Sequence, residues 1–343
     1  MINKKKIFIS IIWLLTILIT LIWTYENPEK IEKAKDTLKY KFSVGKLFTN
    51  IKSKVINRNY KSIEEKKNIE IDSAYNTLNL NYFTIPAYSS YGGIAQIGQD
   101  ILYLSGDSEI FLLKKNIDKK NDYKFQKINS KKIMNNKELF IELNEPKVGK
   151  NAEKYFGIKD ILIEEFDQFK NELLLVSSLD YNKTEDCYVI SVLLAEILDQ
   201  DPLELSEWKK IFSSSKCLSI DLTTNPRFAA ASAGGRLVKL DENSILFSIG
   251  DFYADGVNGP ILSQDLSNLY GKIIKININD LTSEIFSFGH RNPQGLYIDK
   301  DKNIFSTEHG PTGGDELNLV LPNNNYGWPL ATYGTNYKSS DAY

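Results

Sequence analysis

Four pairs of short apolar segments recur along the chain, and the turn that joins each pair contains aspartate, asparagine or both. Successive pairs begin about 60 to 80 residues apart, a spacing typical of repeated β units. One pair buries too little apolar surface to fold alone, so the units must pack side by side in a ring. The sequence therefore predicts an all-β fold of the propeller type. In chain order the pairs are 94–97 with 101–105, 161–163 with 173–177, 237–240 with 245–248, and 296–298 with 304–307.

The stretch 287–333 gathers the polar and conformationally restricted residues of the chain, including both of its histidines. Arg291 stands between His290 and Asn292-Pro293, and a planar cation beside a stiffening proline suits an anion or a polarised carbonyl group. The run 308–316 offers carboxylates and turns that expose main-chain carbonyls, which are ligands for a hard cation such as calcium. Each piece alone also fits an ordinary loop, whereas the combined order and spacing favour a site.

Three motifs in this stretch occur in a specific order: GHRNPQGL at 289–296, EHGPTGGDELNL at 308–319 and NYGWP at 325–329. Together they resemble the glucose/sorbosone dehydrogenase family, the soluble quinoprotein aldose dehydrogenases. The resemblance is dense from about 234 to 334, looser back to about 82, and absent before that. It implies a six-bladed β-propeller that binds pyrroloquinoline quinone (PQQ) and calcium over its central channel. It also implies oxidation of aldose sugars at the anomeric carbon.

The resemblance assigns roles to individual positions. Arg291 and Asn292 fall at the motif positions that contact the quinone, and Asp251, the acid that follows a strand in a Gly-Asp pair, is the third predicted cofactor-binding residue. Arg291 is therefore the predicted catalytic cation, because a nearby positive charge polarises the quinone carbonyl. The predicted metal positions are the main-chain carbonyls of Gly310 and Pro311, with Glu316 and Tyr326 at sites that bind structural calcium in some members.

The catalytic base of the family is not found. The family places an aspartate-histidine pair just ahead of an Arg-Leu pair, and counting back from Arg236-Leu237 places it at Ala231-Ser232. A serine has no proton affinity near neutral pH, and His290 belongs to the loop scaffold of the family. A glutamine-glycine-glycine motif is likewise altered to Tyr155-Phe156-Gly157. Loss of a general base costs about two to four orders of magnitude in rate, so the predicted activity is impaired or redirected.

Two functions remain open from the sequence. The first is a PQQ-dependent oxidoreductase with a sugar substrate and an unknown electron acceptor. The second is a non-catalytic propeller that binds a glycan or a protein partner, which the serine at 232 favours. The formal net charge of −2 excludes neither, and no basic-aromatic pattern indicates nucleic acid.

The N-terminus predicts a membrane anchor. Three lysines at 4–6 precede an uncharged apolar run at 7–23, which as a helix would cover roughly 25 Å. Lysines stay on the cytoplasmic side, so we expect a single-pass inner-membrane protein whose C-terminal domain faces the periplasm or the cell exterior. A cleaved signal peptide is the alternative, but residues 24–28 offer no small-x-small cleavage site.

The predicted organisation is an anchor at 1–25, a charged stalk at 26–80 and a propeller at 81–343. The stalk is expected because lysine, glutamate and asparagine dominate that range. The sequence stops at Tyr343, before the family's last strands and their cofactor-binding lysine and arginine residues. Since an open propeller leaves strand edges unpaired, we expect a fragment of a longer product; a truncated product or completion by another chain are the alternatives.

The two cysteines leave two interpretations open. Cys187 and Cys217 each lie in an apolar strand-like segment, and Asp201-Pro202 lies midway between them as a candidate turn. If the segments pair about that turn, the cysteines face one another. Either a disulfide or two buried free thiols fits this arrangement.

Overall fold

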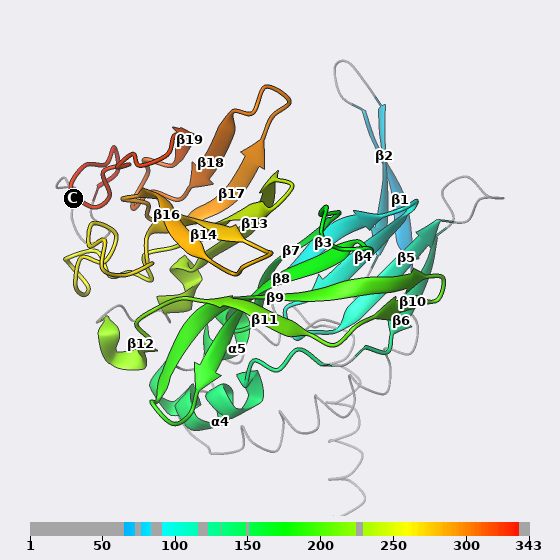
Figure 1. The fold of residues 1–343 in the computed structure, drawn as a ribbon, viewed down its shortest axis with the longest axis horizontal. Coiled ribbons are helices and arrows are strands. Elements are labelled where there is room, and N and C mark those ends of the chain that lie inside the picture. The colour runs from blue at the N-terminus through cyan, green and yellow to red at the C-terminus, as the bar shows by residue number, and fades with distance from the viewer. Residues whose placement is uncertain are drawn as a thin grey trace, which may run out of the picture. The chain divides into compact units, whose positions relative to one another are not determined.

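Four antiparallel sheets follow one another along the chain, and each begins with one of the predicted strand pairs (Figure 1). All four lie in one compact unit, residues 67–81 with 85–343, while of the other unit, 1–66 with 82–84, only residues 65–66 and 82–83 are described. The structure, a computed structural model, describes residues 65–72, 77–83, 91–115, 123–130, 132–148, 151–223 and 229–335.

The first two sheets differ in the length of their strands. The first sheet consists of β3 (Gly92–Ile97), β4 (Asp100–Ser105), β5 (Ile110–Lys115) and β6 (Tyr123–Ile128). The second is built on β7 (Ile158–Glu164), β8 (Leu173–Asn182) and β9 (Cys187–Gln200). The long strand β9 pairs in turn with three short ones, β10 (Leu203–Leu205), β11 (Lys209–Ser213) and β12 (Leu218–Ser219).

The third and fourth sheets carry the motif-rich part of the sequence. The third contains β13 (Gly234–Asp241), β14 (Ser244–Ile249), β15 (Lys272–Asn277) and β16 (Ser283–Phe288). The fourth contains β17 (Pro293–Ile298), β18 (Ile304–Glu308) and β19 (Glu316–Val320). The turn between β17 and β18 is held by Asp299, whose Oδ1 accepts hydrogen bonds from the main-chain NH groups of Asp301 and Asn303, both at 2.8 Å. The aspartate-containing turns of the sequence are thus hairpin turns.

Short helices connect the sheets. α4 (Lys137–Val148) and α5 (Asn151–Tyr155) lie between β6 and β7, and two 3-10 turns, η1 (Ile220–Leu222) and η2 (Ala229–Ser232), precede β13. The sequence did not predict α4 and α5. They contribute Phe140 to the core, where its ring stacks on Phe156 with 4.2 Å between centroids.

The apolar core lies between successive sheets. One cluster joins the first sheet to the second, another joins the second to the third, and a smaller one joins the third to the fourth. All six residues of β14 are buried, because this strand is covered by neighbouring sheets on both faces. The first strands of consecutive sheets also lie side by side, β3 with β7, β7 with β13 and β13 with β17. This is the arrangement of propeller blades around a central channel.

The blade count differs from the sequence prediction. The predicted fold had six blades, incomplete in this chain, and the described residues form four, the last with three strands. The physical reason is that each predicted strand pair starts one blade, and the sequence contains four such pairs. The all-β propeller class itself is confirmed.

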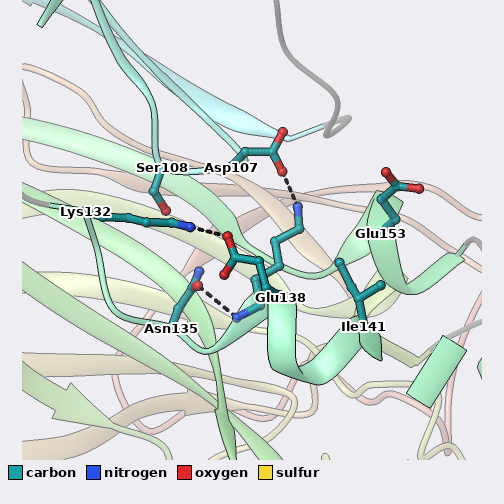
Figure 2. A pocket seen from close by; sticks show the side chains of 8 residues that line it. Asp107, Ser108, Lys132, Asn135, Glu138, Ile141 and Glu153 are labelled. Carbon is teal, nitrogen blue, oxygen red and sulfur yellow. Dashed lines mark hydrogen bonds and ion pairs between the residues drawn. The ribbon is translucent and has the colours of Figure 1, made fainter. Parts of the chain in front are cut away.

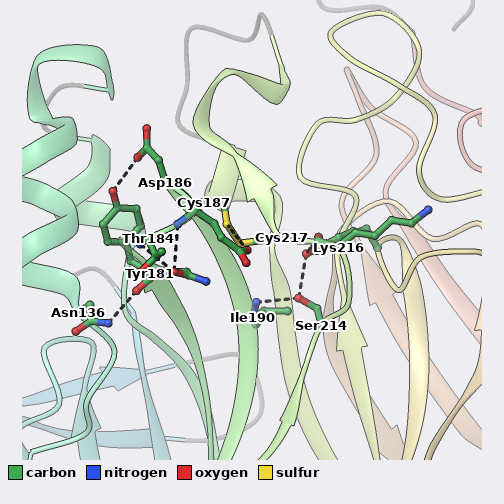
Figure 3. The surroundings of a disulfide bond; sticks show 12 residues. Asn136, Tyr181, Thr184, Asp186, Cys187, Ile190, Ser214, Lys216 and Cys217 are labelled. Carbon is green, nitrogen blue, oxygen red and sulfur yellow. Dashed lines mark hydrogen bonds between the residues drawn. A yellow bond between two sulfur atoms is a disulfide. The ribbon is translucent and has the colours of Figure 1, made fainter.

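The cysteines form a disulfide in the second blade. Cys187 opens β9 and pairs in register with Ser219 of β12, which brings it opposite Cys217 with 5.6 Å between the two Cα atoms. Figure 3 shows the bond and its surroundings. β9 pairs with the strands that follow Asp201-Pro202, as the predicted turn requires. Of the two interpretations left open by the sequence, the structure has the disulfide.

A separate two-stranded sheet pairs β1 (Glu65–Asp72) with β2 (Thr77–Phe83), within and just beyond the range predicted as a stalk. The predicted anchor at 1–25 lies outside the described residues, as does most of the predicted stalk. Within the part of the chain that the structure describes, no helix is long and apolar enough to cross a membrane.

Candidate functional site

Arg291 is buried in the loop that links the third blade to the fourth. Its main-chain NH donates to Glu308 Oε2 at 3.1 Å, and its Nη1 donates to the carbonyl oxygen of His309 at 2.9 Å. The guanidinium lies 5.1 Å from the Trp328 ring and 5.9 Å from the Tyr253 ring. These contacts fix a planar cation against two aromatic faces, a setting that strengthens its interaction with flat anionic ligands.

Asp251 follows β14, two residues after the strand ends, and it contacts the residues around Arg291. Its Oδ1 accepts from the Ser232 hydroxyl at 2.6 Å and from the Tyr253 main-chain NH at 2.9 Å, and its Oδ2 accepts from Trp328 Nε1 at 2.7 Å. Its own NH donates to the carbonyl oxygen of Arg291 at 2.8 Å. Burial raises the pKa of Asp251 to about 6, against the opposing charge of Arg291 and the hydrogen bond from Ser232. Asp251 therefore orients Tyr253 and Trp328, the two aromatic neighbours of the cation.

Ser232, at the position where the family places its base, ends the turn η2. Its side chain is buried and its hydroxyl proton is committed to Asp251. Gly250 allows this close approach, because a Cβ at that position would lie 2.1 Å from the Ser232 carbonyl oxygen. The hydroxyl acts here as a donor that orients a carboxylate, and it has no affinity for a further proton.

His290 and Glu308 form a buried pair behind Arg291. His290 Nδ1 lies 2.5 Å from Glu308 Oε1, its Nε2 lies 2.7 Å from Ser287 Oγ, and its ring stacks on Tyr326 with 4.6 Å between centroids. Burial raises the pKa of Glu308, but the charge and hydrogen bond of His290 outweigh burial and keep that pKa below its ordinary value. With both ring nitrogens engaged, His290 supports the loop and is not placed to take a proton from a substrate.

The predicted metal residues fall into two groups. In the first, Gly310 begins a tight loop: its NH donates to Asp315 Oδ1 at 2.8 Å, and a Cβ on it would lie 2.2 Å from the Gly313 carbonyl oxygen and 2.4 Å from that of Gly314. Pro311 closes the loop against Gly334, on which a Cβ would lie 2.5 Å from the proline Cγ. Carbonyl oxygens and a carboxylate thus crowd one small loop, a donor set that fits calcium.

In the second group, Glu316 and Tyr326 are joined by hydrogen bonds to the scaffold of the fourth blade. Glu316 Oε2 accepts from Asn318 Nδ2 at 3.0 Å, and the same amide donates to Glu308 Oε1 at 3.2 Å. The Tyr326 hydroxyl donates to the Leu319 carbonyl oxygen and accepts from the Leu321 NH, both at 2.7 Å. Asn292, predicted at the quinone, accepts the main-chain NH of Gly234 on its Oδ1 at 3.0 Å.

Sequence reasoning missed Lys159, a buried lysine on β7. Its Nζ donates to the carbonyl oxygens of Tyr155 at 2.6 Å and Ala230 at 3.2 Å, and it lies 4.1 Å from the centroid of the Tyr91 ring. The signal was the pair Lys159-Asp160 inside an otherwise apolar strand. Asp160 has an evident partner, since Arg236 Nη1 donates to it at 2.7 Å.

Aromatic side chains connect Lys159 with Arg291. Burial, and to a smaller extent the neighbouring hydroxyls of Tyr155 and Tyr253, raise the pKa of Tyr91 to about 12. Tyr253 is also one of the two rings beside Arg291. Tyr91, which lies over the Lys159 ammonium, thus interacts with Tyr253, which lies beside Arg291.

A separate pocket of about 200 Å³ lies at the start of α4 (Figure 2). Lys137 is paired with Asp107 there, and Lys132 with Glu138, so its charges are largely neutralised within the protein. None of its lining residues was predicted as a site residue. Its lining consists of Asp107, Ser108, Lys132, Asn135, Lys137, Glu138, Ile141 and Glu153.

The family model for glucose/sorbosone dehydrogenases matches residues 137–343, which is more than half of the 343-residue chain. The chain belongs to the glucose/sorbosone dehydrogenase family. The match includes Ser232, Asp251, Arg291 and the Gly310 loop, and it confirms the family that the sequence motifs indicated.

Individual relatives of this family cover part of the chain. The aldose sugar dehydrogenase of Escherichia coli is 33% identical over 41% of this chain and 38% of its own length. The quinoprotein glucose dehydrogenase B of Acinetobacter calcoaceticus is 28% identical over 36% of this chain and 30% of its own. The chain thus spans about a third of the length of these relatives. The solved soluble aldose sugar dehydrogenase of E. coli shares the fold, with a TM-score of 0.55 at 21% identity, over 74% of this chain and 67% of that one.

These findings correct the predicted localisation. The aldose sugar dehydrogenase of E. coli, to which this chain is similar, is named a soluble protein in its solved structure. This relative points away from a single-pass inner-membrane protein. The prediction rested on a hydropathy argument about residues 7–23, which lie outside the described structure and on which the family match does not bear.

Proposed function

We propose that this protein is a sugar oxidoreductase that uses PQQ with calcium and oxidises aldoses at the anomeric carbon. The observation that carries the proposal is the setting of Arg291, a buried guanidinium fixed between the rings of Trp328 and Tyr253. PQQ is a flat, anionic quinone, and such a ligand matches a planar cation with aromatic walls. The quinoprotein name of the Acinetobacter relative supports the same cofactor.

The residues present fit both groups. Arg291 would hold and polarise the quinone, and the amide of Asn292, whose Oδ1 is fixed by Gly234, would present its NH2 end. The carbonyl oxygens of the Gly310 loop, those of Gly310 and Pro311 among them, would hold calcium. When bound, PQQ accepts a hydride from the sugar, while the buried pairs around Asp251 and Glu308 keep the cation in place.

The test is a titration of the purified protein with PQQ and calcium, followed by absorbance, and then addition of aldoses with an artificial electron acceptor. We expect saturable binding that a calcium chelator reverses, and reduction that depends on sugar. Arg291→Lys keeps the charge but loses the planar stacking, so it should weaken PQQ binding by about tenfold or more. Arg236→Lys, which changes an arginine paired with Asp160, is the matched control. Absence of PQQ binding by the wild type would overturn the proposal.

A non-catalytic binding module is the second candidate. Burial of Ser232 against Asp251, where the family places its base, favours it. Binding of PQQ without reduction by any aldose would support this alternative.

A further inference from the structure

Lys159 is buried without a carboxylate partner among the described residues. Its ammonium contacts two main-chain carbonyls and an aromatic face, and the adjacent Asp160 is paired with Arg236. Such surroundings disfavour the charged form, because neither carbonyls nor a ring replace the lost hydration fully. A neutral amine here keeps both hydrogen bonds with its two NH groups and retains a free lone pair.

Lys159 contacts the segment that contains position 232, where the family places its catalytic base. Its Nζ bonds Ala230, which belongs to the same turn, η2, as Ser232. The next strand is equally close, since a Cβ on Gly235 would lie 2.4 Å from Lys159 Cβ. The Tyr91 ring over the amine also interacts with Tyr253, one of the two rings beside Arg291. Lys159 therefore lies beside the segment from which the family supplies its proton acceptor.

We propose that the amine of Lys159 is the proton acceptor for sugar oxidation in this protein, in place of a side chain at position 232. This inference rests on the proposed function. The sugar O–H bond breaks and its proton forms an N–H bond with the neutral amine. The anomeric C–H bond breaks, and bound PQQ would take up the hydrogen with its electron pair as a hydride; the resulting quinol anion would take its second proton from solvent. The sugar becomes a lactone, and the ammonium later releases its proton to solvent.

The charges that face Lys159 are compatible with this role. Burial, and to a smaller extent the positive charge of Lys137 on α4, lower the pKa of Lys159 to about 7. Lys137 is itself paired with Asp107. The other ionisable groups around the amine are the hydroxyls of Tyr91, beside β3, and Tyr155, at the end of α5, and the Asp160–Arg236 pair on β7 and β13.

Two substitutions separate proton transfer from anion binding. Lys159→Arg keeps a positive charge that cannot be removed near neutral pH, and Lys159→Met removes it. If the amine is the base, both variants should bind PQQ like the wild type and lose about 10²- to 10⁴-fold in kcat. If Lys159→Arg keeps its kcat, or if Lys159→Met mainly loses PQQ affinity, the lysine binds an anion instead and the inference is wrong.

Lys272 provides the matched control. It is buried too and donates to three carbonyl oxygens, those of Leu262, Ser263 and Tyr270, and among the described residues none of these bonds goes to the turn η2. Lys272→Met should leave kcat per bound PQQ unchanged. An equal loss in both lysine variants would show a structural effect and overturn the catalytic assignment.

The pH dependence supplies a second kinetic readout. Only the neutral amine accepts a proton, so kcat of the wild type should rise with pH through about 7, and this slope should be absent from the residual rate of Lys159→Arg. A wild-type profile that is flat between pH 6 and 9 would contradict the assignment.

A third readout needs no cofactor. NMR of the protein with isotope-labelled lysines should show one signal, absent in both Lys159 variants, that titrates near neutral pH. A titration midpoint above about 9 would overturn the inference, because the amine would then be charged at working pH. If the wild type fails to bind PQQ, the proposed function falls; if it oxidises sugar and Lys159→Arg does so equally, only the role of Lys159 falls.

Discussion

Two buried cations of this protein are held in opposite ways. We call Arg291 with Asp251, His290, Glu308 and Trp328 the Arg291 site, and Lys159 with Tyr91, Tyr155 and Ala230 the Lys159 site. In the first, two carboxylates and several directed hydrogen bonds fix the cation and its loop. In the second, the partners of the cation within the described part of the chain are carbonyl oxygens and a ring.

The comparison shows that burial of a cationic side chain can serve two different purposes in one protein. A charge surrounded by opposite charges stays charged and stays in place, as a group that polarises a ligand must. A charge surrounded by neutral dipoles changes its protonation state without breaking its surroundings, as an acid-base group must. The comparison can be tested by removing the partners of the Arg291 site one at a time.

The largest effect is expected for Glu308→Gln. The amide removes the negative charge that faces His290 and sets an NH2 group against existing donors, so the free energy of unfolding should fall by about 3–5 kcal/mol. Urea denaturation measures this, with the exposed Glu284→Gln, expected within about 0.5 kcal/mol of wild type, as control. A loss below about 1 kcal/mol for Glu308→Gln would mean that the Glu308 carboxylate does not hold the Arg291 site in place, and the contrast with the Lys159 site would fail.

A smaller effect should appear in the pH dependence of stability for Asp251→Asn. Burial raises the pKa of Asp251 from 3.8 to about 6, so the folded state holds this proton where the unfolded state has lost it. The free energy of unfolding of the wild type should therefore fall between pH about 4 and 6, by about 3 kcal/mol from this group. The difference curve against Asp251→Asn should show that slope, and a flat difference would contradict the raised pKa.

The smallest effect is expected for Ser232→Ala. The variant removes one of the donors to Asp251, at 2.6 Å, while the NH of Tyr253 and the indole of Trp328 remain. Thermal or urea unfolding should show a loss of about 1.5 kcal/mol, against no more than about 0.5 for the exposed Ser283→Ala. Equal losses in the two variants would indicate that the hydrogen bond from Ser232 to Asp251 does not stabilise the Arg291 site.

The fold was largely readable from the sequence because its repeat is local. Each strand pair and its aspartate-containing turn lie within some twenty residues, and all four predicted pairs are present. The helices α4 and α5 were not predicted, because their polar, lysine- and glutamate-rich sequence has no clear apolar stripe. The disulfide was left open because pairing depends on the register of β9 with β12.

The site was readable only where short motifs carry it. Arg291, Asn292 and the Gly310 loop lie in recognisable motifs, and Asp251 follows a strand end. Lys159 was not readable, because its carbonyl partner on Ala230 lies 71 residues away in the sequence and its ring partner lies in another blade. A lysine in a buried strand acquires meaning only when the surrounding blades are placed.

The close contact between Lys159 and Gly235 restricts which residues can occupy these two positions. Gly235 has a φ of +112° and no room for a side chain, since its Cβ would overlap the stem of the lysine. Because the nearest atom is the lysine Cβ, a side chain at 235 would clash with any residue other than glycine at 159. Glycine at 235 is therefore required by the backbone position of 159 and not by the length of the lysine.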